Sequence, residues 1–383
     1  MTGLYLHIPF CKKACSYCNF HFSTSRRQQQ EMVDAIAREL VLRRHEAEGG
    51  LLRTVYFGGG TPSLLTSAQL GQLFEVIHEH YTVQAEAEIT LEANPDDLTP
   101  AMLRRLATTS VNRLSIGIQS FYDEDLAMMN RAHSAAEAGR CIDLARDAGF
   151  EQLTIDLIYG LPEGYRDHWR ATLDRALAYE LPHYSCYALT VEPRTALAHQ
   201  VDKGRLTYLP DEADADFTYL RQQMQAHGYE HYEISSFARP GQYARHNTAY
   251  WSGSPYIGVG PAAHSFDGVA YRRWNVANNA RYIRSILTEN TVPHEGEALT
   301  PYDRYNEYMM TGLRTQWGVS RAQVAAIDPR LVPAFIRMSE ESVQSGSLIR
   351  QGDGYALPDH ALLFADGIAA ELFVDEEEYG ALA

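Results

Sequence analysis

Apolar runs of strand length alternate with amphipathic runs of helical length through the first half of the chain. The strand-like runs are 3–6, 55–57, 88–92, 113–118, 153–158 and 184–189, and the helix-like runs are 31–48, 66–80, 99–108, 134–148 and 167–179. Such alternation is typical of consecutive βα units, which form a parallel sheet with helices outside. Right-handed crossovers curl this sheet toward a barrel. Eight units would close a full barrel, so six predict an open, partial (β/α)6 barrel of the TIM type.

Polar residues and glycines follow each predicted strand at the point where its apolar run stops. These segments are a cysteine-rich loop at 11–18, then 58–62, 92–95, 117–120 and 156–160. In barrels of this type, chemistry gathers at the carboxyl ends of the strands. We therefore expect one rim to collect all five segments.

Three cysteines directly after the first strand, Cys11, Cys15 and Cys18, are spaced C-x3-C-x2-C. Soft thiolates select iron–sulfur clusters, zinc or copper(I). With no fourth cysteine nearby, a four-iron cluster would keep one iron open for chemistry or ligand exchange. A zinc site that adds His21 to two of these thiols, or inert buried thiols, are the alternatives. Closed zinc sites more often come as two separated ligand pairs, so the spacing favours a cluster.

Length and charge narrow the class of protein further. A chain of 383 residues suggests two domains. The formal charge of -16 argues against a nucleic-acid partner. We find no signal peptide and no apolar run near the roughly 20 residues that span a bilayer. Cys141 and Cys186 lie in a helical and a strand pattern and are expected in the core, so the five cysteines form no disulfide framework and indicate a reducing cytoplasm.

The longer string LYLHIPFCKKACSYC, with Tyr17 just before the third cysteine, resembles the signature of the radical S-adenosylmethionine (SAM) superfamily. In particular it is similar to the oxygen-independent coproporphyrinogen III oxidase branch, which includes the haem chaperones. The resemblance covers most of the chain and is strongest over residues 4–160. It implies a [4Fe-4S] cluster on the three cysteines, with SAM at the open iron.

Residues along the expected rim match the positions that bind SAM in these relatives. A triple glycine at 58–60 leaves backbone N–H groups that can bind a carboxylate, and Glu92 could accept hydrogen bonds from a ribose diol or be a solvated strand end. Arg131 can pair bidentately with a carboxylate, although a surface arginine is the commoner case. The resemblance implies SAM contacts at Tyr5, Tyr17, Gly59, Gly60, Thr61, Glu92, Gln119, Arg131, Asp156 and Thr190.

Beyond residue 200 the alternation weakens to a helix at 211–228 and a strand at 229–237, and then RHNTAYW at 245–251 resembles the H-N-x-x-Y-W motif of the haem-chaperone branch. His246 could offer an imidazole to haem iron, while Tyr250 and Trp251 could pack on the macrocycle. The alternative is a structural loop histidine with two anchoring aromatics. His264, in a strand-and-turn segment at 256–266, is a second candidate ligand.

The last part of the chain predicts a small separate domain. A helix at 277–288 leads to a linker at 293–297, and further helices are expected at 304–315, 320–327 and 331–345. A hairpin at 348–357 turns at 352–354, and the arrangement resembles a winged-helix-like domain with a structural or docking role. The predicted domains are a radical SAM core at 1–230, a barrel extension at 231–294 and this domain at 295–383.

Two departures separate the chain from the oxidases that it resembles. Phe20 stands where they have a fourth cysteine, and their N-terminal extension is absent, since the first strand begins at residue 4. Oxidase activity, the radical decarboxylation that gives protoporphyrinogen IX, is therefore the alternative rather than the main expectation, and whether the chain is an enzyme stays open.

The main expectation is a haem chaperone with three bound groups: the [4Fe-4S] cluster, SAM and haem. Its partners would be haem-acceptor proteins such as membrane-bound respiratory subunits, with no nucleic acid among them. The cluster and SAM would govern haem release or a haem-linked homodimer. We expect a cytoplasmic protein that does not span the membrane and meets its surface during haem delivery.

Overall fold

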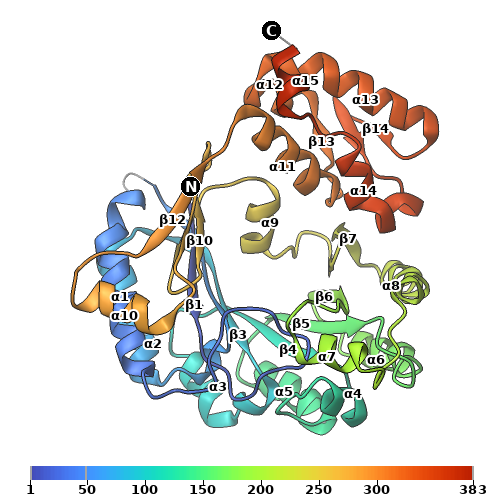
Figure 1. Cartoon of the computed structure of the whole chain (residues 1–383). Helices are drawn as coiled ribbons and strands as arrows, with labels where there is room; N and C mark the ends of the chain where they lie inside the picture. The colour runs from blue at the N-terminus through green and yellow to red at the C-terminus, as the bar shows by residue number, and fades with distance from the viewer. Residues whose placement is uncertain (1, 48–49, 382–383) are drawn as a thin grey trace.

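Six parallel strands form the centre of the computed structural model, which describes residues 2–47 and 50–381 (Figure 1). They are β1 (Thr2–Ile8), β2 (Leu52–Gly59), β3 (Val83–Ala93), β4 (Arg113–Gln119), β5 (Gln152–Tyr159) and β6 (His183–Ala188), paired in sequence order. The connecting helices are α1 (Gln29–Arg43), α2 (Ser67–His80), α3 (Pro100–Leu106), α4 (Asp123–Met128), α5 (Ala135–Asp147) and α6 (His168–Leu177). The predicted βα alternation is confirmed. Only α4 was not expected, and residue 48, where the first predicted helix was to end, lies outside the described residues.

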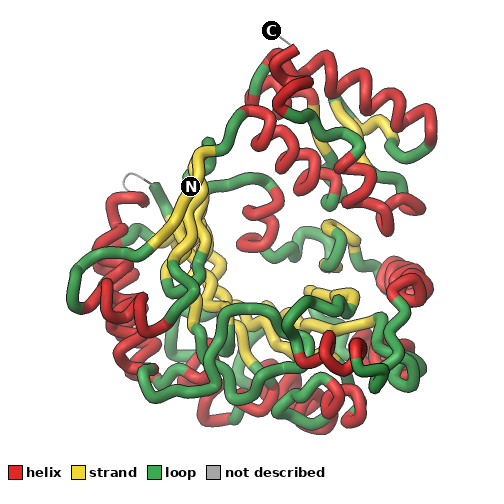
Figure 2. The backbone as a smooth tube through the Cα atoms, viewed as in Figure 1, coloured by secondary structure: helices red, strands yellow, loops and turns green. Residues whose placement is uncertain are grey.

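Further strands extend this sheet at both edges; the one beside β1 is parallel to it, and the other added pairs are antiparallel. Next to β6 lie β8 (Ser236–Ala238) and β7 (Glu230–Glu233), and next to β1 lie β9 (Tyr256–Val259), β10 (His264–Phe266), β11 (Tyr271–Asn275) and β12 (His294–Ala298). The order in the twelve-stranded sheet is β12-β11-β10-β9-β1-β2-β3-β4-β5-β6-β8-β7. Strands β7 and β12 are its two ends, so the barrel is open, as the predicted partial barrel requires (Figure 2).

Two local expectations in the second half of the chain are wrong. The single strand expected at 229–237 is a hairpin, because a turn at 234–235 separates β7 from β8. The expected linker at 293–297 lies mostly in β12, which pairs with β11 from Tyr271↔Ala298 to Asn275↔His294. An exposed strand of this kind gives no apolar alternation, since all five residues of β12 face solvent.

Burial and capping explain the elements that the sequence predicted well. All seven residues of β4 are buried, as expected for a central strand that helices and a barrel interior cover on both faces. The first turns of α2 and α5 carry capping boxes, Thr66 with Gln69 and Ser134 with Glu137. Helices α7 (Ala196–Asp202), α8 (Ala213–Ala226), α9 (Arg245–Trp251) and α10 (Asn279–Leu287) complete this part. No helix of the described residues is long and apolar enough to cross a membrane.

A second hydrophobic core lies in the C-terminal part. It is built by α11 (Pro301–Leu313), α12 (Arg321–Ile327), α13 (Val332–Ser345), α14 (Ala365–Ala370) and a sheet of β13 (Val319–Ser320), β15 (Gly354–Ala356) and β14 (Ile349–Gln351), with α15 (Glu376–Ala381) beside them. The three helices and the hairpin agree with the sequence, and β13, α14 and α15 were missed. The exact domain boundaries stay predictions. Backbone hydrogen bonds from Ile234 to Arg314 (2.9 Å) and from Gln316 to Tyr232 (2.9 Å) join this part to the β7–β8 hairpin.

A buried polar network fixes the β9–β11 extension against α1. The Glu39 carboxylate, fully buried, accepts hydrogen bonds from Arg43 Nη1 (3.0 Å), Asn275 Nδ2 (2.7 Å), Gly260 N (2.8 Å) and Tyr282 Oη (2.5 Å). The Arg43 guanidinium also donates to Gly258 O (2.5 Å) and Ser265 Oγ (2.9 Å). Every charge in the network is therefore paired, which a buried ion pair needs in order to be tolerated.

We predict that Glu39→Ala lowers the free energy of unfolding by about 3–5 kcal/mol, because it removes one of the two carboxylates of Arg43, leaving only Glu46, and deprives Gly260 N, Asn275 and Tyr282 of their buried acceptor. Urea denaturation of the full chain measures this loss. The matched control is Glu75→Ala, at an exposed position of α2, which should change the free energy by no more than about 0.5 kcal/mol. Equal effects of the two substitutions would contradict the proposed weight of the network.

Candidate functional site at the barrel rim

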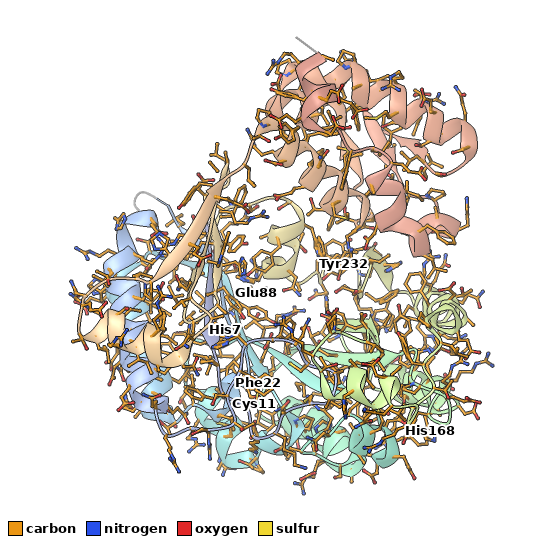
Figure 3. All side chains as sticks on the ribbon, in the orientation of Figure 1. His7, Cys11, Phe22, Glu88, His168 and Tyr232 are labelled. Atoms are coloured by element: carbon orange, nitrogen blue, oxygen red, sulfur yellow. The ribbon has the colours of Figure 1, made fainter. Side chains whose placement is uncertain are left out.

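The cysteine loop leaves the end of β1 and is closed at its base by backbone hydrogen bonds. Cys11 N donates to Ser23 O (3.0 Å), and Ser23 N donates to Pro9 O (2.8 Å). Within the loop, Ser16 N donates to Met129 O (3.0 Å). Cys11 and Phe22 mark this loop in Figure 3, and all three of its cysteines are half-buried free thiols.

Arg131 joins the cysteine loop to the ends of two strands. Its Nη1 donates to Cys15 Sγ (3.2 Å), and its Nη2 donates to Asn94 Oδ1 (2.6 Å) and Gly117 O (2.6 Å). Its buried Nε has no partner among the described residues. A lysine could not replace Arg131 here. A guanidinium has five N–H donors, so it can bond to three acceptors and still offer another N–H, whereas a lysine ammonium has only three.

Burial favours the protonated form of two thiols of the loop, Cys11 and Cys18. Burial raises the pKa of Cys11 to about 11, although Thr61 Oγ1 lies 3.6 Å from its sulfur and opposes that shift. Burial also raises the pKa of Cys18. Thiolate ligands must be deprotonated, so metal uptake here is coupled to proton release. Among residues 2–47 and 50–381, no three His, Cys, Asp or Glu side chains are arranged to hold a single metal ion.

The triple glycine at the end of β2 lets two chain segments approach closely. A Cβ atom at Gly60 would lie 2.7 Å from Phe10 O, and one at Gly59, where φ is +104°, would lie 2.6 Å from His7 Nδ1. Gly60 N already donates to Ile8 O (2.9 Å). These glycines are thus required by packing against the β1 end, and the N–H of Gly60 is not available to a ligand in this arrangement. The sequence could not distinguish this packing from close approach by a ligand.

Glu92 ends β3 inside the rim and is not a solvated strand end. Tyr56 Oη donates to its Oε1 (2.8 Å). Burial raises the pKa of Glu92 to about 7, and the nearby Asp156 carboxylate adds to the shift. Burial likewise raises the pKa of Asp156 to about 6. Tyr56 was missed by the sequence analysis, and its signal was slight: a hydroxyl-bearing side chain within an otherwise apolar strand.

Two other predicted SAM contacts gather near Arg131. Gln119 is buried with a φ of +67°, a conformation that costs a residue with a side chain on the order of 1–3 kcal/mol and is most often found at functional sites. Its Nε2 and Arg131 Nη2 each lie 2.9 Å from where a Gly117 Cβ would be. Tyr17 is half-buried and packs against a small apolar cluster that includes Leu126 and Met129.

Thr190 follows the end of β6 and lines a different cavity from Tyr5 and Glu92. It is exposed, its hydroxyl donates to Ala188 O (3.4 Å), and it lines a separate cavity together with Tyr208 and Leu363.

A cavity of about 860 Å³ opens beside the rim, between the barrel and the C-terminal part. The rim contributes Tyr5, His7, Gly59 and Glu92, the cysteine loop contributes Asn19, Phe20 and His21, and the β9–β11 extension contributes Tyr256, His264 and Val269. Arg304, Tyr308 and Ile327 of α11 and α12 form the opposite wall. We call this space the rim cavity. Its volume falls within the range of about 300–1,000 Å³ that is usual for small-molecule sites.

The H-N-x-x-Y-W segment forms helix α9, whereas the alternative interpretation of its histidine placed it in a loop. The Glu88 carboxylate from β3 accepts hydrogen bonds from the backbone N–H groups of Arg245 and His246 (2.9 Å each), and so satisfies the start of the helix (Figure 3). Trp251, at the other end, lies under the Arg314 guanidinium at 5.5 Å and does not line the rim cavity.

His246 uses both of its ring nitrogens inside the protein. Nδ1 lies 2.7 Å from Thr54 Oγ1 and Nε2 lies 2.9 Å from Tyr250 Oη, and only 2 % of the residue is exposed. Burial lowers the pKa of His246 to about 3, so the ring is neutral. Tyr250 stands between His246 and the rim cavity, which it lines.

Comparison with known proteins agrees with this arrangement. The profile of the radical SAM superfamily matches residues 5–176. The solved structure of the coproporphyrinogen III oxidase HemN from Escherichia coli, described as a radical SAM enzyme, has a TM-score of 0.83, covers 97% of this chain and 90% of its own, and is 24% identical. The partial barrel is therefore a radical SAM fold.

Sequence relatives narrow the family. The heme chaperone HemW of Bacillus subtilis is 35% identical over 85% of this chain and 86% of its own length. The proteins of the same name from Mycobacterium tuberculosis H37Rv and Escherichia coli are 33% and 31% identical over 97% and 98% of this chain, and cover 94% and 98% of their own lengths. The chain belongs to the family of the heme chaperone HemW.

Ionisation of Glu92 predicts a pH-dependent stability. Because its folded-state pKa of about 7 exceeds the ordinary 4.5, ionisation costs the folded state free energy as the pH rises between these values. Glu92→Gln removes this cost, so the variant should gain roughly 1–3 kcal/mol over the wild type between pH 4.5 and pH 8.

Urea denaturation at several pH values measures this difference. Glu86→Gln, at an exposed position of the same strand, is the control and should follow the wild type at every pH. A parallel pH dependence of wild type and Glu92→Gln would contradict the assignment.

Proposed function

We propose that the chain is a haem chaperone that carries a [4Fe-4S] cluster and SAM at the barrel rim, binds haem, and transfers it to an acceptor protein. The observation that carries this proposal is the rim itself: three free thiols in one loop, an arginine that contacts one of them, and the Glu92 carboxylate, which lines the rim cavity together with Asn19, Phe20 and His21 of the same loop. The relatives named heme chaperone, which align over most of the chain, support the choice of function.

Cys11, Cys15 and Cys18 would hold the cluster. The donor set fits it, because three free thiols occupy one loop and Arg131 and Thr61 face two of the sulfurs. Each thiolate of a cluster binds a different iron, so the thiols need not converge on one point as they would around zinc. With SAM bound, such a cluster supplies one-electron chemistry that belongs to the cofactor.

The chain's own residues would bind and orient SAM. The Glu92 carboxylate, ionised above about pH 7, would accept hydrogen bonds from the ribose hydroxyls. The hydrogen bond from the Tyr56 hydroxyl orients this carboxylate. The free Nε of Arg131 is a buried donor close to the loop. The remaining proposed contacts are Tyr5, Tyr17, Gly59, Gly60, Thr61, Gln119, Asp156 and Thr190.

The hydrogen bonds of His246 limit how α9 can take part in haem binding. His246 can reach iron only if it gives up the hydrogen bond to Tyr250 or to Thr54, whereas Tyr250 already lines the rim cavity. We propose that the His246–Tyr250 pair forms part of the haem site, with Trp251 anchoring the helix against Arg314. Transfer to membrane-bound respiratory subunits from the cytoplasmic side, and a haem-linked homodimer, complete the proposal.

Coproporphyrinogen oxidation is the alternative that the fold keeps in view. Phe20, which takes the place of the oxidases' fourth cysteine, points an apolar ring at the rim cavity and is 70% exposed. We expect haem to bind with one-to-one stoichiometry. We also expect no decarboxylation when the reconstituted protein is incubated anaerobically with SAM, dithionite and coproporphyrinogen III. Substantial formation of protoporphyrinogen would overturn the chaperone proposal.

Cys11→Ser should abolish most of the iron and sulfide that anaerobic reconstitution incorporates, because the loop then keeps only two thiolates. Metal analysis and the absorption spectrum measure the loss. Cys141→Ala, at a buried position of α5, is the control and should retain the full cluster content. A Cys11→Ser protein with unchanged iron content would exclude the loop as the cluster site.

A further inference from the structure

We propose that haem lies in the rim cavity, with the His264 imidazole as an iron ligand and the Arg304 guanidinium as the partner of a propionate. This inference rests on the haem binding proposed above and specifies where it occurs. It differs from ligation by His246, which the sequence motif suggested.

His264 is the histidine of the rim cavity whose ring has no partner. It belongs to β10, is exposed, and forms no side-chain hydrogen bond within residues 2–47 and 50–381. Of its neighbours, His7 uses Nδ1 with Tyr5 Oη (3.2 Å) and Nε2 with His21 O (2.9 Å). His21 uses Nε2 with Asn279 Oδ1 (2.7 Å). A free, accessible imidazole is what an axial haem ligand requires.

The ring of His264 is also supported by its strand, because β10 pairs with β11 and His264 lies opposite Trp274. The ring stacks on Trp274 at 5.8 Å, and the next residue, Ser265, receives a hydrogen bond from Arg43 in the buried network with Glu39. A ligand on such a supported strand is positioned before the metal arrives.

Apolar side chains on the walls of the rim cavity suit a flat, apolar macrocycle. Phe20 and Val269 line the rim cavity with exposed fractions of 70% and 60%, the largest apolar exposures on its walls, and Ile327 stands on the wall of α12. Leaving large apolar side chains in water has no benefit for the empty protein, and such patches mark binding sites. A bound porphyrin would remove these side chains from water.

Arg304 provides the one arginine of the cavity walls that lacks an ion pair among the described residues. Arg272 is neutralised by Glu297 (2.5 Å) and Glu307 (2.7 Å), whereas Arg304, half-buried in α11, has no acceptor for its guanidinium. In a chain with a net charge of -16, an unpaired cation facing a cavity suits a carboxylate ligand. A haem propionate is such a group.

The test is a ferric haem titration of the full-length protein, followed by optical absorption and electron paramagnetic resonance. The variants are His264→Gly, His264→Met, His246→Ala and Arg304→Gln, with His45→Ala as a control at an exposed histidine outside the cavity. Circular dichroism and cluster iron content establish that each variant is folded.

We expect His264→Gly to weaken haem binding by about tenfold or more and to change the spin state and ligand field of the iron. Added imidazole should restore the wild-type spectrum, and His264→Met should give the spectrum of a thioether ligand. Arg304→Gln should weaken binding by about tenfold without altering the spectrum, since it removes a charge-assisted hydrogen bond to the propionate but no iron ligand. His45→Ala should match the wild type.

An unchanged spectrum and affinity for His264→Gly would overturn this inference while the proposed chaperone function stands. The same holds if only His246→Ala removes the iron ligand. A wild-type protein that takes up no haem would instead overturn the proposed function, and this inference with it.

Discussion

The Arg131 guanidinium is the contact on which the arrangement of the rim depends. It reaches the sulfur of Cys15 in the cysteine loop, the amide oxygen of Asn94 after β3 and the carbonyl oxygen of Gly117 in β4. Along the chain these residues lie 116, 37 and 14 residues from Arg131. A guanidinium stays charged at every accessible pH, so this junction does not loosen when nearby carboxyl groups titrate. The positive charge also lowers the pKa of Cys11 and Cys18, against the larger effect of burial, which raises it.

Parallel strands explain why such distant segments can meet at all. Because neighbouring strands of the core run in the same direction, their carboxyl ends lie at one edge, and each following loop begins there. The close approach of the β1 and β2 ends then needs residues without side chains, which Gly59 and Gly60 supply. The buried network of Glu39 and Arg43 fixes β9 and β10 against the core. It thereby positions the wall of the rim cavity that carries His264.

The features that the sequence predicted well are those that follow from local burial. The strands and helices of the core alternate with the periods that their buried faces impose, and the cysteine spacing is local too. What it missed depends on partners far away in the chain. Helix α9 forms because Glu88, 157 residues before Arg245, accepts its first N–H group. Likewise, the bonds of His246 to Thr54 and Tyr250 cannot be inferred from the motif, which shows the imidazole but not what surrounds it.

The two ways in which the C-terminal part is attached have a mechanical consequence. Backbone hydrogen bonds join it to the β7–β8 hairpin, where Ile234 pairs with Arg314. At the rim cavity, the ion pair of Arg272 with Glu307 links the two parts. Backbone hydrogen bonds join uncharged groups and depend little on salt. A partly exposed ion pair, in contrast, weakens as the ionic strength rises. High ionic strength therefore weakens this bridge before it affects the contacts at the hairpin. The connection from β12 to α11, whose Leu299 also lines the rim cavity, keeps the two parts joined there when the ion pair is lost.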